Sequence, residues 1–130
     1  MTINKKEMLL SYIRVNVAPI LVDFLSGKDL PYATILPANL DIKELNGHYE
    51  NTEYLPPRWL NKLQQNSNNL LVIDQIDTIS KQEQLKFYEL LKHRKISTFV
   101  LPSECRIIIT ATEINKDKIN EKIYSLVAQI

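Results

Sequence analysis

The sequence predicts an α/β domain in three layers, with a parallel sheet between two layers of helix. Short, nearly unbroken apolar runs are typical of strands that are buried on both faces, and here they alternate with segments of helical periodicity. Such alternation is the pattern of a parallel sheet. The chain has 130 residues, of which 45% are hydrophobic, so we expect a single domain over residues 1–130.

The first third of the chain is expected to supply one helix and two strands. Asn4–Val17 carries apolar residues at helical spacing. Ala18–Leu25 is an almost unbroken apolar run and predicts a buried strand, and Pro31–Pro37 predicts a second strand between its own prolines. Because bare apolar area in water costs about 25 cal/mol per Å², either this helix or a second chain must cover the sheet, and we favour the helix. Its apolar residues are Met8, Leu9, Tyr12 and Ile13.

The middle of the chain is expected to hold short elements. Asp41–Leu45 predicts one helical turn that ends at Asn46 and Gly47. The polar and aromatic stretch 47–57 predicts a loop or a hairpin, and Arg58–Gln65 predicts a short helix after two prolines.

The second half predicts a buried strand followed by a well-marked helix. Leu70–Asp74 is the strand. Ser80, with Glu83 three residues later, forms the pattern of a capping box that opens a helix. The basic stretch 92–95 suits the negative end of the helix dipole. The expected inner face of this helix is Leu85, Tyr88 and Leu91.

The last third predicts two more strands and a closing helix. Ile96–Leu101 and Cys105–Thr112 are apolar runs separated by a turn. Lys116–Ala128 is expected to be the helix, with Ile119, Ile123 and Leu126 on its inner face.

Charge and cysteine content argue against several classes of function. The 16 basic and 15 acidic residues leave a net charge of +1, so nothing indicates nucleic acid or a membrane surface as a partner. Polar residues interrupt the N-terminal apolar positions, which argues against a signal peptide or a membrane span. Cys105 is the only cysteine, so it cannot form an internal disulfide and is expected to pack as a small buried side chain. This fits a reducing compartment, and the expected location is cytoplasmic.

The stretch from Tyr54 to Thr112 resembles the middle of an AAA+ ATPase core of the MoxR or dynein-related type, a P-loop NTPase fold. In that family a Pro-Arg-Trp-like helix precedes the Walker B strand, as residues 57–59 precede Leu70–Asp74. A helix rich in Gln and Leu, a basic pair, a hairpin leading to Leu-Pro and the sensor 1 strand follow in the same order. Order and spacing over this length are more specific than any single motif. The resemblance implies a truncated AAA+ core.

The chain departs from the family at the phosphate loop. A P-loop needs Gly-x-x-x-x-Gly-Lys-Ser/Thr, because its backbone N–H groups wrap the phosphates and its hydroxyl holds Mg²⁺. The nearest match contains Gly27 and Lys28, but Val22 replaces the first glycine and Asp29 replaces the hydroxyl residue. We expect this segment to be a surface turn.

The resemblance also assigns the remaining nucleotide-site positions. Asp74 matches the Walker B acid that would hold Mg²⁺, and Gln75 stands where the family has its catalytic glutamate. Glutamine can orient a water molecule but cannot take its proton. Thr112 stands at the sensor 1 position. Asp74 also has a purely structural interpretation, as a carboxylate that ends a strand and caps a loop.

The leading hypothesis is a catalytically inactive AAA+-like domain that acts in protein interaction or regulates an ATPase assembly. No arginine is found where the family has its arginine finger, and the sequence ends at Ile130, before a helical lid. No cofactor is then expected, while a protein partner or self-association is. One alternative is weak or partner-completed Mg-ATP binding and hydrolysis through Asp74. Another is a clamp-loader-like, DNA-associated subunit, which rests on fold kinship alone.

Overall fold

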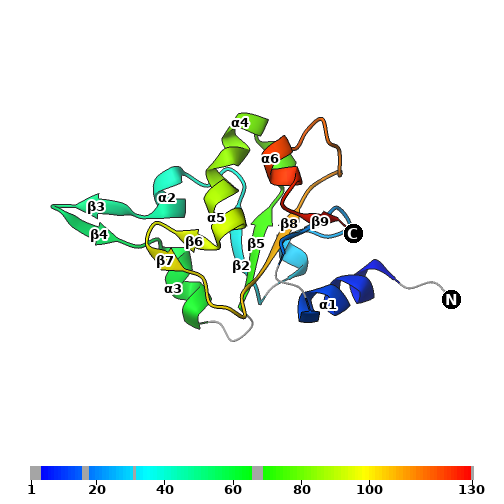
Figure 1. The fold of residues 1–130 in the computed structure, drawn as a ribbon, viewed down its shortest axis with the longest axis horizontal. Helices are drawn as coiled ribbons and strands as arrows, with labels where there is room; N and C mark the ends of the chain where they lie inside the picture. The colour runs from blue at the N-terminus through cyan, green and yellow to red at the C-terminus, as the bar shows by residue number, and fades with distance from the viewer. Residues whose placement is uncertain (1–3, 16–17, 31, 66–68, 130) are drawn as a thin grey trace.

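A five-stranded parallel sheet forms the centre of the molecule, in the order β2-β5-β8-β1-β9 (Figure 1). The computed structural model describes residues 4–15, 18–30, 32–65 and 69–129. The expected α/β class and parallel sheet are confirmed. The strands of the sheet are β1 (Ile20–Val22), β2 (Thr34–Pro37), β5 (Leu70–Asp74), β8 (Arg106–Thr110) and β9 (Ala128–Gln129).

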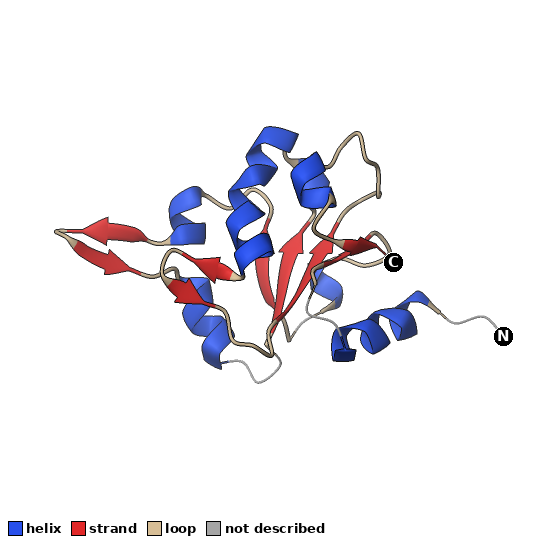
Figure 2. Cartoon of the chain, in the orientation of Figure 1, coloured by secondary structure: helices blue, strands red, loops and turns tan. Residues whose placement is uncertain are grey.

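One face of the sheet is covered by several short helices (Figure 2). Alternate residues of the strands, such as Leu71 and Ile107, pack there with Leu63 and Leu90 in the larger of two core clusters. Cys105 is buried in the same cluster, as expected, and burial raises the pKa of its thiol to about 11. These helices are α2 (Ile42–Asn46), α3 (Arg58–Gln65), α4 (Lys81–Gln84), α5 (Tyr88–His93) and α6 (Glu121–Tyr124).

The opposite face is covered by α1 (Lys5–Val15), as the sequence led us to expect. Leu9 is only 3% exposed and packs in the second core cluster with Ile20, Val72 and Ile108. Arg106 Nε donates a hydrogen bond of 2.9 Å to the carbonyl oxygen of Ile13, which attaches the end of the helix to the start of β8.

Part of the expected contact surface of α1 was wrong. Met8 is 45% exposed, whereas Tyr12 and Ile13 are partly buried against the second cluster. Leu9 and Ile13 are four residues apart and therefore lie on one side of the helix. The contacts of α1 with the second core cluster therefore run along Leu9 and Ile13, and Met8 lies at their border. Residues 16 and 17, which the predicted helix included, lie outside the described part of the chain.

Two β-hairpins project from the side of the sheet where β2 lies (Figures 1 and 2). The first consists of β3 (His48–Glu50) and β4 (Glu53–Leu55), so the stretch predicted as a loop or hairpin is a hairpin. The second consists of β6 (Lys95–Ile96) and β7 (Phe99–Val100). The expected strand Ile96–Leu101 was therefore wrong. The chain reverses at Ser97, whose φ of 51° lies in the left-handed region.

The helix predicted after Ser80 is present, but its inner face differs from the expectation. Ser80 Oγ accepts a hydrogen bond of 3.2 Å from the N–H of Glu83, which confirms the cap. A 3₁₀ turn, Leu85–Phe87, then separates α4 from α5. Because 3₁₀ geometry has three residues per turn, Gln84, Phe87 and Leu90 align and are fully buried. Leu91 is buried as predicted, but Leu85 and Tyr88 are only partly buried, contrary to the prediction.

The expected C-terminal helix Lys116–Ala128 was largely wrong, because only α6 is helical there. Asn120 Oδ1 accepts from the N–H of Lys122 and starts the helix at that point. The chain then turns, and the N–H of Ala128 donates to the carbonyl oxygen of Pro19 at 2.8 Å. Ala128 and Gln129 thus pair with β1 as a fifth strand, which the sequence did not predict.

Within the described ranges, no helix combines the length and the apolar content needed to cross a membrane.

We expect Leu9→Ala to lower the free energy of unfolding by about 2–5 kcal/mol, because it opens a cavity in the cluster that covers the sheet. Leu10→Ala is the matched control, since Leu10 is 58% exposed, and it should change stability by no more than about 0.5 kcal/mol. Urea unfolding followed by circular dichroism measures both. Equal effects of the two substitutions would show that α1 does not cover the sheet.

Candidate functional site

The carboxylate of Asp74 connects the C-terminal ends of three strands. Asp74 is the last residue of β5, and its Oδ1 accepts a hydrogen bond of 2.8 Å from the N–H of Gly27, in the loop that follows β1. The same oxygen accepts a hydrogen bond of 2.8 Å from the hydroxyl of Thr110, the last residue of β8. One oxygen of the Asp74 carboxylate is therefore bound to two donors of the protein itself.

Gln75 belongs to the same network through its backbone. Its N–H donates to Thr110 Oγ1 at 2.8 Å. Thr110 is fully buried, and its hydroxyl joins the end of β8 to the end of β5, because it accepts from the Gln75 N–H and donates to Asp74 Oδ1. Gln75 adopts the left-handed conformation, with φ 60° and ψ 54°, and this turns the chain out of β5 into a 3₁₀ turn, Ile76–Thr78.

The loop that was compared with a P-loop is closed on itself. Gly27–Asp29 is a single 3₁₀ turn. The Ser26 N–H donates to Asp29 Oδ2 at 2.9 Å, and this bond lowers the pKa of the Asp29 carboxyl group. The N–H groups of Asp29 and Leu30 donate to the carbonyl oxygens of Ser26 and Gly27, each at 3.0 Å. The N–H groups of Ser26, Gly27, Asp29 and Leu30 are thus directed to the protein, and the expected surface turn is what the structure shows.

Gly27 lies unusually close to the side chains of Ile35 and Asp74. A Cβ atom at this position would lie 3.0 Å from Ile35 Cγ2 and 3.1 Å from the Asp74 carboxyl carbon. Both distances are shorter than ordinary van der Waals contact, so a larger residue would push the turn away from β5. The glycine that resembled a P-loop residue serves here to bring the backbone against a carboxylate.

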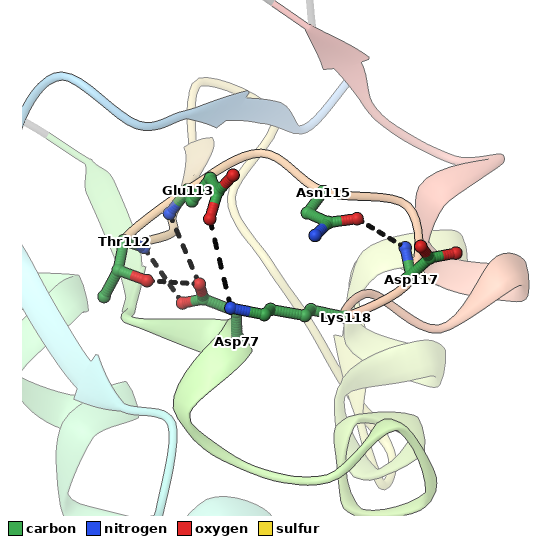
Figure 3. A network of polar contacts seen from close by, with 6 residues as sticks. All are labelled: Asp77, Thr112, Glu113, Asn115, Asp117 and Lys118. Carbon is green, nitrogen blue, oxygen red and sulfur yellow. Dashed lines mark hydrogen bonds and ion pairs between the residues drawn. The ribbon is translucent and has the colours of Figure 1, made fainter.

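Thr112 does not join Asp74. Asp77 holds it instead, as Figure 3 shows. Asp77 Oδ1 accepts from the N–H of Thr112 at 2.9 Å, and Asp77 Oδ2 accepts from the Thr112 hydroxyl and from the N–H of Glu113 at 3.3 Å. Glu113 lies 3.9 Å from Lys118 across the same loop. This network fixes the segment that follows β8.

The pKa of Asp77 is below its ordinary value of 3.8. Partial burial opposes the shift, but the hydrogen bonds from Thr112 and Glu113 to the ionised carboxylate outweigh it.

Of the three predicted site residues, the structure brings together Asp74 and Gln75 and leaves Thr112 in a separate network. Sequence reasoning missed Thr110. The available signal was a polar residue directly after three consecutive isoleucines. In the described part of the chain, no three His, Cys, Asp or Glu side chains gather in a group that could hold a metal ion.

No family model matches the chain, and no curated protein matches it significantly.

We expect Asp74→Ala to lower the free energy of unfolding by about 1–3 kcal/mol without any nucleotide, because the Gly27 N–H loses its acceptor and the buried Thr110 hydroxyl loses one of its partners. The matched control is Asp23→Ala, which removes an exposed carboxylate at the end of β1 and should change stability by about 0.5 kcal/mol at most. Chemical denaturation measures both. An Asp74→Ala protein as stable as the wild type would contradict the structural role.

The second prediction for this site concerns the ionisation of the Asp77 carboxyl group. Because folding lowers its pKa, ionised Asp77 stabilises the fold above its ordinary value of 3.8, and this contribution is lost as the pH falls through the lowered pKa. Asp77→Asn should therefore be less stable than the wild type at neutral pH, and the two stabilities should converge in acid. Urea unfolding across the acid range tests this. A difference that is constant with pH would show that ionisation of Asp77 is not involved.

Proposed function

We propose that this chain is a non-hydrolysing AAA+-like domain that acts by binding other proteins, as a regulator or structural part of an ATPase assembly. The observation that carries the proposal is the hydrogen bond from the Gly27 N–H to Asp74, in the space where a P-loop and a Walker B acid would hold Mg-ATP between them. The chain fills this space with its own carboxylate.

The charges at the loop support the same conclusion. A phosphate site requires N–H groups that are free to face the anion. Here the N–H groups of Ser26, Gly27, Asp29 and Leu30 are all bonded within the protein. Asp29 and Asp74 also place two carboxylates at the turn, which would repel a triphosphate.

The strand order is compatible with the proposal. β8 lies between β1, which precedes the Gly27 turn, and β5, which ends at Asp74.

Protein binding is supported by aromatic and apolar side chains on the hairpins. Tyr49 is 70% exposed and Val100 is 71% exposed. The Tyr54 ring lies between Tyr49 and Phe99, with centroid distances of 5.3 and 5.9 Å, so the two hairpins share one aromatic cluster. Exposed aromatic clusters are typical of surfaces that contact other proteins.

Mg-ATP binding remains the second candidate, and one observation favours it. The residues that match the P-loop and Walker B positions, Gly27 and Asp74, lie side by side although they are far apart in the sequence. A partner that opened the turn would expose both.

We expect millimolar ATP with Mg²⁺ to leave the melting temperature of the wild-type protein unchanged, measured by differential scanning calorimetry. A ligand that binds the folded state at about 100 times its Kd stabilises it by about 2.7 kcal/mol, which would be a shift of several degrees. Mg²⁺ without ATP is the blank. A rise that occurs in the wild type and is absent in Asp74→Ala would contradict the proposal and favour the Mg-ATP alternative.

A further inference from the structure

We propose that β3, the first strand of the first hairpin, pairs antiparallel with β3 of a second copy of this chain, about a two-fold axis at Tyr49. This inference rests on the proposed function, since it gives the protein-binding activity a site and a partner. The residues concerned take no part in the Asp74 network.

The outer edge of β3 carries no other strand. Among the described residues, β3 pairs with β4 alone, and all three residues of β3 are exposed. The hairpin projects from the body of the molecule, and its tip lies far from the central sheet (Figure 1). A strand of another chain can therefore reach this edge, and an open strand edge is a template for pairing.

The turn of the hairpin determines which backbone groups of β3 face outward. Both residues of the turn have positive φ, of 49° and 72°, as in a type I′ turn. Glu50 and Glu53 flank this turn and are therefore a hydrogen-bonded pair. Because such pairs alternate along an antiparallel ladder, the next pair, Tyr49 with Tyr54, is not hydrogen-bonded. The N–H and the carbonyl group of Tyr49 thus point away from β4.

Symmetric pairing at Tyr49 gives both of these groups a partner. A residue on a two-fold axis faces its own copy, so the Tyr49 N–H of each chain donates to the Tyr49 carbonyl oxygen of the other. The two Tyr49 side chains also meet. Each is 70% exposed in the single chain, and aromatic cross-strand pairs stabilise a sheet. Because the strands run in opposite directions, the two bodies lie at opposite ends of the shared ribbon.

The side chains beside Tyr49 select a second copy as the partner. His48 precedes Tyr49 and Glu50 follows it, so in this register Glu50 of each chain lies opposite His48 of the other. Within one chain Glu50 lies opposite Glu53, and like charges in that arrangement are unfavourable. His48 Nε2 is 3.5 Å from Glu50 Oε1 in the single chain, so both lie on one face. An imidazole donates to a carboxylate even when it is neutral.

The other edge of the hairpin lacks this complementarity. A two-fold axis at Tyr54 places the carboxylate of Glu53 opposite Leu55, which offers it no partner. Tyr54 is also only partly exposed, and Phe99 packs on its ring with a centroid distance of 5.9 Å. Of the two edges, β3 is therefore the one that fits a second copy.

The pairing is weak and reversible. An edge of three residues buries less than the roughly 1,200 Å² of a stable interface, so we expect a Kd of roughly 0.1–1 mM. An assembly that holds copies side by side raises their effective concentration, and a contact of this strength then becomes effective.

The experiment measures self-association of the full chain by sedimentation velocity up to about 1 mM, and compares two variants of β3. The acidic variant is His48→Glu, and the basic variant is His48→Lys with Glu50→Lys. Each variant alone places like charges opposite one another across the axis, so its Kd should rise by about tenfold or more. A mixture of the two places opposite charges there, and it should form a heterodimer at least as readily as the wild type forms its dimer.

Two controls make the result specific. Glu104→Lys with Glu121→Lys adds basic charge at exposed positions outside the hairpin, and a mixture of this protein with the acidic variant should not associate. Tyr49→Pro removes the outward N–H, at an edge position where proline is tolerated, and should abolish the dimer, whereas Tyr49→Val keeps the N–H and should retain it in part. The charge variants change only exposed side chains, so they test the proposal even if Tyr49→Pro disturbs the hairpin.

Three outcomes would overturn the inference: the wild type stays monomeric up to about 1 mM, the two β3 variants do not associate when mixed, or the mixture with the control protein associates equally well. These failures are distinct from failure of the proposed function. A monomeric protein that ignores ATP contradicts only the pairing of β3, whereas ATP binding through Asp74 contradicts the proposed function whatever the oligomeric state.

Discussion

The hydrogen bonds to the carboxylate of Asp74 set the geometry of the whole C-terminal edge of the sheet. One oxygen atom receives donors from the loop after β1 and from the end of β8, while its residue ends β5. Hydrogen bonds to a carboxylate are stronger than those between neutral groups. This one oxygen atom therefore aligns three strand ends. The position of the Gly27 turn, its need for glycine and the direction in which the chain leaves β5 all follow from it.

The hydrogen bonds to Asp74 also explain how the sheet is completed without a helix directly after β1. Gly27–Asp29 turns back at once and leads directly toward β2, so nothing from this connection can cover the sheet except the turn and its neighbours. Leu25 and Ala33, before and after the turn, are buried in the cluster that Leu9 of α1 completes. The two layers of helix are therefore unequal. Among the described residues, one consists of the short helices α2 to α6, and the other of α1 with a few loop residues.

Long apolar runs made the central strands predictable from sequence, whereas short elements were not predicted. Leu70–Asp74 was placed correctly because four consecutive apolar residues before the aspartate leave little choice. Ala128–Gln129 has two residues, and its strand character comes from the hydrogen bond to Pro19, which no local pattern contains. Only part of the candidate site could be predicted from the sequence, for a similar reason. Alternation along a strand puts Thr110 and Thr112 on one side, and only the departure of the chain after Thr110 turns Thr112 to Asp77.

The position of β1 in the middle of the sheet has a consequence for synthesis. β1 pairs with β8 and β9, whose residues lie near the other end of the chain. During synthesis, the apolar stretch Ile20–Val22 leaves the ribosome early. Its two neighbouring strands, β8 and β9, are synthesised much later. Pairings of such long sequence separation form slowly, and unpaired apolar strands aggregate while they wait. The nascent chain should therefore depend on chaperones until β8 and β9 appear.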